Sequence, residues 1–219
     1  MIRAVLRWLF PEKCVLCRKI LPPEQTDLCH ACRADAGAVP SGKKASAHLA
    51  GWTAVWYYDG AVRQSLLRFK FGGARSYAGA YGRMMAMKIS QEFPLPVDLL
   101  TWVPVSRARR FRRGYDQAEL LAKSVGRELG MQPVRLLRKR RNNRTQSTIR
   151  SEAERRANVL GVYTACRPEL VQGKRILLLD DIFTTGATAG ECARVLLTAG
   201  AKEVYCAAVA AARHDSKNR

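Results

Sequence analysis

The residues best suited to chemistry lie together between Asp180 and Thr188. An apolar run, 175–179, ends in two acids, Asp180 and Asp181, and a short turn and a helix are expected to follow. Ligands of open parallel sheets bind beyond the carboxyl ends of the strands, and a helix N-terminus presents unpaired N–H groups that hold phosphate. The residues of the turn that we expect to bind a phosphate are Thr184, Thr185, Gly186, Ala187 and Thr188.

The two acids indicate what accompanies that phosphate. A carboxylate does not bind phosphate, but it accepts hydrogen bonds from hydroxyl groups such as the 2′-OH and 3′-OH of a ribose. The competing interpretation is an ordinary strand–turn–helix with one capping threonine. It leaves unexplained why Asp180 and Asp181 are paired at the end of an apolar strand, where charge is costly. The sequence therefore predicts a sugar-phosphate site.

Four cysteines form a second candidate site. Cys14 and Cys17 make one CxxC pair and Cys29 and Cys32 another, with eleven residues between the pairs. Four thiolates in two close pairs suit a tetrahedral structural zinc ion. Redox-active pairs and buried free thiols are the alternatives, but neither needs two matched pairs. We predict that these four side chains bind zinc.

Basic residues are concentrated in two segments, 107–113 and 135–144. The whole chain has 38 Lys and Arg against 18 Asp and Glu, a net charge of +20. That charge favours a polyanionic partner: nucleic acid, a phosphorylated substrate or an anionic membrane surface. A solvated charge run is the simpler alternative. Phe111 and Tyr115 are interleaved with the first segment, as in sites that bind single-stranded DNA by charge and stacking. The residues assigned to a nucleic-acid or loop role are Arg109, Arg110, Arg112, Arg113, Arg138, Lys139, Arg140, Arg141 and Arg144.

The elements that must position these residues alternate between strand and helix, which predicts an α/β fold with a mainly parallel sheet. The expected strands are 53–58, 99–105, 133–137, 175–179 and 204–209, and the expected helices are 61–71, 77–91, 116–129, 151–156 and 187–199. We predict a zinc-ribbon module at 1–36, a linker at 37–50, the main domain at 51–212 and a polar tail at 213–219.

The sequence offers no candidate for a membrane span. No apolar run approaches the ~18 residues that a spanning helix needs. The first ten residues carry Arg3 and Arg7 within a short apolar stretch, and no signal-peptide pattern follows. We expect an amphipathic first helix, and we expect the protein in the reducing cytoplasm.

Residues 176–188, ILLLDDIFTTGAT, resemble the phosphoribosyl pyrophosphate (PRPP) motif of type I phosphoribosyltransferases, and that resemblance extends over about 52–210. The chain is also similar to the ComF (competence protein F) family, also called double-zinc-ribbon or amidophosphoribosyltransferase-like proteins. The segments that carry this similarity, besides the cysteines, are 58–60, 67–70, 103–105 and 112–117. This chain departs from the usual ComF sequence at two places. It has Arg68-Phe69-Lys70 where Leu-Lys is commoner, and Tyr115-Asp116 where Phe-Asn is commoner.

The resemblance implies a type I phosphoribosyltransferase fold preceded by a small N-terminal zinc-ribbon module. It implies that Asp180 and Asp181 bind the ribose hydroxyls of PRPP, that 184–188 bind its 5′-phosphate, and that Val105 and Ser106 belong to the turn that meets its pyrophosphate. The basic stretch around 138–144 corresponds to a loop that closes over the pyrophosphate. Mg²⁺ is implied as part of the bound PRPP.

Two functions fit this resemblance. One is a cytoplasmic protein that binds PRPP and single-stranded DNA and acts with the DNA-uptake machinery in natural transformation. The alternative is an active phosphoribosyltransferase that displaces pyrophosphate from PRPP onto an unknown acceptor, with Asp181 as the candidate acid or base. The sequence does not identify the acceptor.

Overall fold

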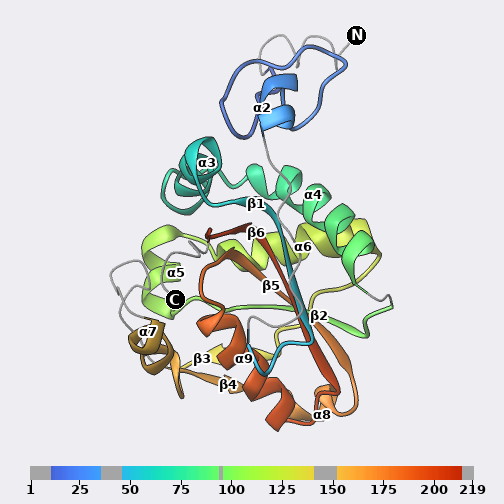
Figure 1. The fold of residues 1–219 in the computed structure, drawn as a ribbon, viewed down its shortest axis with the longest axis vertical. Coiled ribbons are helices and arrows are strands. Elements are labelled where there is room, and N and C mark those ends of the chain that lie inside the picture. Colours follow the sequence, from blue (N-terminus) through green and yellow to red (C-terminus); the bar gives the residue numbers. More distant parts are fainter. Residues whose placement is uncertain (1–10, 36–45, 94–95, 141–151, 214–219) are drawn as a thin grey trace.

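A four-stranded parallel sheet forms the centre of the molecule (Figure 1). The computed structural model describes residues 11–35, 46–93, 96–140 and 152–213. The strand order is β1-β6-β5-β2, and all three pairings are parallel. The strands are β1 Gly51–Tyr57, β2 Leu99–Trp102, β5 Arg175–Phe183 and β6 Glu203–Ala211. The predicted α/β class with a mainly parallel sheet is confirmed.

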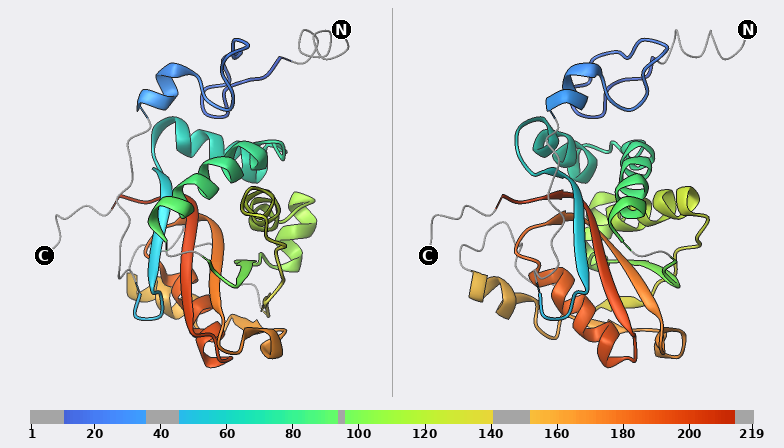
Figure 2. Two further views of the ribbon diagram at one scale, coloured as in Figure 1. Left: turned by 90° about the vertical axis from the view of Figure 1, so that its right-hand side faces the viewer. Right: turned by 45° about the vertical axis from the view of Figure 1, so that its right-hand side comes forward.

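Helices cover both faces of this sheet. Alternate residues of β5 point to opposite faces, so that Leu177 and Leu179 belong to one apolar cluster and Ile176 and Leu178 to the other. Figures 1 and 2 show α4 and α6 on the first side and α9 on the second. The helices are α2 His30–Asp35, α3 Gly60–Phe71, α4 Tyr77–Glu92, α5 Arg107–Arg113, α6 Gln117–Leu129, α7 Glu152–Val159, α8 Pro168–Val171 and α9 Ala187–Thr198.

The N-terminal cysteine module, of which the structure describes residues 11–35, packs beside α3 (Figure 1). Its apolar residues Val15, Leu16, Leu21 and Leu28 are buried in the same cluster as α3 and α4. The first ten residues, most of the predicted linker and the last six residues lie outside the described parts of the chain. Within the described parts, none of the helices combines the length and hydropathy of a membrane span.

Several element boundaries differ from the sequence-based expectation. The strand expected at 133–137 is wrong: Pro133 forms only an isolated bridge with Leu100, and the short strand β3 Leu137–Lys139 pairs antiparallel with β4 Tyr163–Ala165 instead. Proline has no N–H to donate to a ladder, which disfavours a strand there. The strand expected at 175–179 continues to Phe183, because its pairing with β6 continues to Ala211.

Candidate sugar-phosphate site

A cavity of about 340 Å³ lies at the carboxyl edge of the sheet, where β2 and β5 end. The predicted acids and part of the predicted phosphate loop line it, as do side chains from α3, α5, α6, β3 and β4. Among the described residues, five basic side chains and two acidic ones face it. The basic residues are Arg63, Lys70, Arg109, Arg113 and Lys139. This excess of positive charge suits a ligand with several negative charges, such as a sugar with more than one phosphate group.

The two acids lie inside β5 rather than after it, and their surroundings differ. Asp181 is buried, and its two oxygens are engaged: Lys70 Nζ lies 2.9 Å from Oδ1, and Gln117 Nε2 donates to Oδ2 at 2.8 Å. Asp180 is half-buried, and its Oδ1 accepts the Asp181 amide at 2.8 Å. Burial, and then the charge of Asp181, raises the pKa of Asp180 well above its usual range.

Lys70 and Gln117 are functional candidates that the sequence analysis missed. They come from α3 and α6, and they reach Asp181 across 111 and 64 positions of the chain respectively. Both belong to segments that carry the family resemblance, 67–70 and 112–117, and that resemblance was the only available signal. Helical spacing alone does not show which distant carboxylate they meet.

The predicted phosphate loop divides between two hollows. Thr184 and Thr188 line the cavity, whereas Thr185, Gly186 and Ala187 line a separate hollow of about 260 Å³ beside α7 and α9. Gly186 has a φ of +74° just before α9 begins, a conformation that favours glycine. The Thr185 hydroxyl is buried without a hydrogen-bond partner among the described residues. The turn and the start of α9 thus have the expected form.

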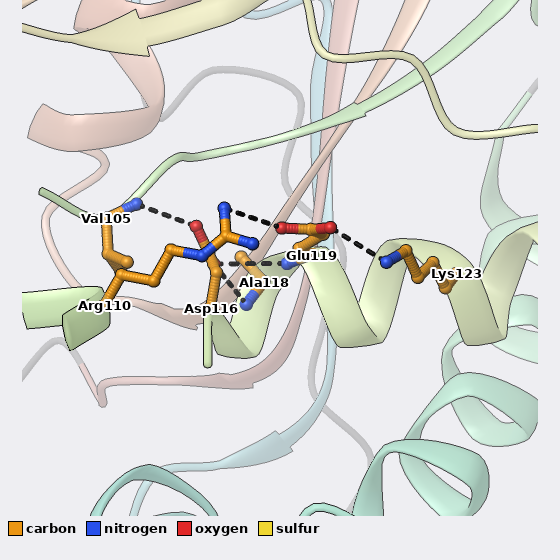
Figure 3. A network of polar contacts seen from close by, with 6 residues as sticks. All are labelled: Val105, Arg110, Asp116, Ala118, Glu119 and Lys123. Atoms are coloured by element: carbon orange, nitrogen blue, oxygen red, sulfur yellow. Dashed lines mark hydrogen bonds and ion pairs between the residues drawn. The ribbon is translucent and has the colours of Figure 1, made fainter. Parts of the chain in front are cut away.

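Val105 and Ser106 lie at the predicted pyrophosphate turn, and each already makes a hydrogen bond within the protein. The Val105 amide donates to Asp116 Oδ2 at 3.2 Å, and the Asp116 Oδ1 accepts the amides of Ala118 and Glu119 at the start of α6 (Figure 3). Val105 lines the cavity. Ser106 is buried, and its Oγ accepts the Arg109 amide at 3.3 Å as the N-cap of α5.

Asp116 is therefore a structural anchor beside the cavity. Burial raises the pKa of its carboxyl group, and the three amides that it accepts oppose that shift. Figure 3 also shows Glu119 between two cations: Arg110 lies 3.5 Å away, and Lys123 lies 2.8 Å away. Part of the positive charge of α5 is thus balanced by α6.

The first arginine cluster forms α5, and the helix separates it into two groups. Arg109 and Arg113, four positions apart, line the cavity, while Arg110 and Arg112 are exposed. Arg113 donates to Gln117 Oε1 at 2.9 Å and lies 4.7 Å from the centre of the Phe71 ring. Burial lowers the pKa of Arg113, and the charge of Asp181 opposes this shift.

The two aromatic residues of this segment also differ in their exposure to solvent. The Phe111 ring is 92% exposed on α5, so it is accessible to a stacking partner. Tyr115 is buried, and its hydroxyl donates to the Phe69 carbonyl. The expectation that Tyr115 stacks on a nucleic acid therefore does not fit this structure.

The second basic segment contributes Lys139 to the cavity. Lys139 Nζ lies 5.3 Å from the centre of the Tyr163 ring, and burial, with the nearby charge of Arg109, lowers its pKa to about 8. Arg138 and Arg140 are exposed. Arg141 and Arg144 lie outside the described residues. Of the described part of this segment, only Lys139 faces the site of the acids.

The four predicted zinc ligands lie together. The sulfur atoms of Cys14, Cys17, Cys29 and Cys32 are all within 4.8 Å of one another, and Cys17 and Cys29 are 3.6 Å apart. Zn–S bonds of about 2.3 Å in a tetrahedron place sulfur atoms about 3.8 Å apart, so the four residues fit a zinc ion. Burial opposes ionisation of Cys14, but nearby amide donors outweigh it and lower its pKa to about 7. Burial raises the pKa of Cys17 and Cys32. Binding of zinc by four thiolates therefore displaces protons from the cluster.

The parallel sheet, the strand–turn–helix with its paired acids, and the cysteine cluster define a phosphoribosyltransferase-type domain with a zinc-binding module. The phosphoribosyl transferase domain family matches residues 112–219, and the double zinc ribbon domain family matches residues 5–43. These matches agree with the prediction of a structural zinc site at the four cysteines. Residues 5–43 contain only those four cysteines, enough for one tetrahedral site.

Named relatives agree with this class. Competence protein ComFC of Bacillus subtilis is 32% identical over 146 residues, which cover 67% of this chain and 58% of that protein. DNA utilization protein YhgH of Escherichia coli K12 is 30% identical over 148 residues, covering 64% of this chain and 63% of that protein. Competence protein F of Haemophilus influenzae is 24% identical over 219 residues, covering 89% and 95%. This chain belongs to the ComF family, as the sequence motifs predicted.

A solved structure is also similar. Glutamine PRPP amidotransferase of B. subtilis, complexed with ADP and GMP, is 22% identical with a TM-score of 0.43, and the match covers 64% of this chain and 30% of that one. The chain spans 58% and 63% of the length of the first two curated relatives that it matches.

Proposed function

We propose that this protein binds PRPP, with the Mg²⁺ that accompanies its pyrophosphate, in the cavity at the carboxyl edge of β2 and β5. The observation that carries the proposal is one cavity that holds Asp180 and Asp181, two threonines of the turn before α9 (Thr184 and Thr188) and five basic side chains. The acids suit ribose hydroxyls, the turn suits the 5′-phosphate, and the cations suit the pyrophosphate.

The contacts of Asp181 support PRPP binding rather than catalytic turnover. Its carboxylate is buried, paired with Lys70 and hydrogen-bonded by Gln117. Each Asp181 oxygen keeps a further lone pair for a ribose hydroxyl, so this pairing is compatible with PRPP binding. Taking a proton as a general base would instead break the ion pair with Lys70. We therefore favour a PRPP-binding protein over the alternative, transfer of the phosphoribosyl group to an acceptor.

Calorimetric titration of the purified protein with PRPP and Mg²⁺ tests this site. The double variant Asp180→Ala with Asp181→Ala is expected to lose PRPP binding and to keep its zinc content, because the cysteine cluster lies beyond α3. Binding by this variant equal to that of the unmodified protein would contradict the assignment. Release of pyrophosphate, measured with and without single-stranded DNA, separates a binding protein from a transferase.

We further propose that single-stranded DNA binds along the outer face of α5, and that the protein acts in DNA uptake or DNA use in the cytoplasm. Curated relatives are named competence proteins and DNA utilization proteins. The outer face of α5 offers the exposed cations Arg107 and Arg112 beside the exposed ring of Phe111. Charge and an aromatic face are the two components of sequence-independent binding to single strands. Proteins of the uptake machinery are the expected partners.

Fluorescence anisotropy with a labelled oligothymidylate over a range of salt concentrations tests the DNA proposal. Each phosphate contact on a single strand contributes about 0.7 to the slope of log binding constant against log salt concentration. Loss of two contacts therefore reduces the magnitude of this slope by about 1.4. We expect this change for Arg107→Ala with Arg112→Ala. The matched control is Lys174→Ala with Lys202→Ala, which removes two exposed charges at the amino ends of β5 and β6. An equal effect of both double variants would refute the assignment to α5.

A further inference from the structure

The helix α3 has one face toward the cavity and an opposite face toward the cysteine module. Arg63, Leu67 and Lys70, spaced i, i+4 and i+7, line the cavity. Ser65 and Arg68, spaced i and i+3, contact the module. At 3.6 residues per turn the centres of these two sets are about 160° apart around the helix axis. One rigid helix thus connects the two sites.

The module side of α3 is held by hydrogen bonds to backbone carbonyls. The Ser65 hydroxyl donates its single hydrogen to the Val15 carbonyl, so the Tyr81 hydroxyl, 2.6 Å away, donates to Ser65 Oγ. Arg68 Nη2 donates to the Leu16 carbonyl at 2.5 Å. The two accepting residues are those between the first pair of cysteines. The turn between the two metal ligands Cys14 and Cys17 therefore positions these carbonyls.

That turn is also packed against α3. Val15 is 2% exposed and Leu16 is 3% exposed, and both belong to the apolar cluster that includes Leu66 and Phe69 of α3. A bound zinc ion holds the turn through thiolates on either side of it. Without the ion, the turn loses the bonds that fix its carbonyls, and α3 loses a fixed support on its module side.

The cavity side of α3 carries a contact that depends on the position of the helix. The Lys70 side chain is 17% exposed, and its ammonium group lies 2.9 Å from Asp181 Oδ1. This ion pair offsets the charge of one of two adjacent carboxylates in a cavity that we propose binds a polyanion. Displacement of α3 lengthens the pair, leaves Asp181 less neutralised, and so weakens the attraction for an anion.

We propose that the cysteine module positions Lys70 through α3, with Ser65 and Arg68 as positioning residues. The metal state of the module then controls the Lys70–Asp181 pair and, through it, the affinity of the cavity for anions. The effect on affinity rests on the proposed PRPP function. The effect on the ion pair does not, and it can be tested without any ligand.

Competitive acetylation of lysines, read by mass spectrometry, tests the ion pair directly. We expect Lys70 to react several-fold faster in Arg68→Ala, in the milder Ser65→Ala, and after removal of zinc with a chelator. Lys88 is the internal control, because its side chain is 19% exposed and pairs with Glu92 on α4 at 2.7 Å. The variant control is Arg83→Ala on α4, which removes an ion pair between the main domain and the module, Arg83–Asp27, and leaves the α3 side chains unchanged.

Any of three results would overturn the proposal. The first is an unchanged reactivity of Lys70 in Ser65→Ala, Arg68→Ala and the zinc-free protein. The second is a rise in the reactivity of Lys88 equal to that of Lys70, which would mean general loosening rather than movement of α3. The third is an equal rise in the reactivity of Lys70 in Arg83→Ala, which would refute the role of Ser65 and Arg68.

A double-mutant cycle with PRPP as the probe tests the link to affinity. If Arg68 acts through Lys70, Arg68→Ala weakens PRPP binding in the unmodified protein and has no further effect when Lys70 is already Met. Additive losses would show that Arg68 does not act through Lys70. Absence of PRPP binding by the unmodified protein would refute the proposed function, while the acetylation result would still decide the positioning role.

Discussion

Lys139 is expected to make anion binding in the cavity depend on pH. Its pKa is about 8, because burial and the charge of Arg109 disfavour the ammonium form. About nine tenths of Lys139 side chains are then charged at pH 7 and about one tenth at pH 9. A polyanion beside Lys139 stabilises the ammonium form, so the complex retains the proton that the free protein loses. Affinity therefore falls as pH rises through 8, by about tenfold or about 1.4 kcal/mol between pH 7 and pH 9.

The assay is calorimetric titration with PRPP and Mg²⁺ at several pH values. Lys139→Arg keeps its charge over this range, so its affinity is expected to stay nearly constant. The difference between the two proteins cancels the ionisation of the ligand itself. Lys139→Met is expected to bind weakly at every pH. An identical pH profile for the unmodified protein and Lys139→Arg, or a profile that persists in Lys139→Met, would refute this reasoning.

Three further predictions concern the packing that holds the site. Gly82→Ala places a methyl group 2.2 Å from Ser124 Oγ, so we expect a loss of about 1–3 kcal/mol in urea denaturation, whereas Gly79→Ala, with its nearest neighbour at 3.8 Å, is tolerated. Asp116→Ala removes the α6 cap and is expected to cost about 1–2 kcal/mol in the same assay, while Asp116→Asn keeps the cap and costs less. Gly186→Ala, at a φ of +74°, is expected to cost about 1–2 kcal/mol and to weaken PRPP binding; unchanged calorimetric affinity would argue against a phosphate at this turn.

The elements could be predicted from the sequence where local signals determine them. The helix expected over 116–129 ends at Leu129, and Gly130 follows it with a φ of +67°. The helices α3, α4 and α9 begin and end within one residue of their expected bounds. The end of β5 could not be predicted locally, since its last residues pair with β6 and Phe183 stacks on Trp52 at 4.5 Å. The acids that the sequence indicates as the end of a strand therefore lie within it.

The site was predictable only in part for a similar reason. The acids, the threonine turn and the cysteines each form a compact sequence pattern. The structure places both acids in one cavity and the four cysteine sulfurs within 4.8 Å of one another, but it divides the threonine turn between two hollows. Lys70 and Gln117 belong to the site through tertiary contacts with Asp181. Nothing in the spacing of an amphipathic helix indicates which carboxylate a lysine on its inner face meets.

The arginine cluster shows how one sequence pattern can serve two surfaces. In the sequence, five arginines within seven residues form a single basic patch. In the structure, the helical turn of α5 directs Arg109 and Arg113 to the cavity and leaves Arg107, Arg110 and Arg112 exposed. Because the two groups are fixed on one helix but face different surroundings, PRPP affinity and the salt dependence of DNA binding are expected to respond to different members of the cluster. A single charge count cannot separate these roles, whereas the periodicity of the helix does.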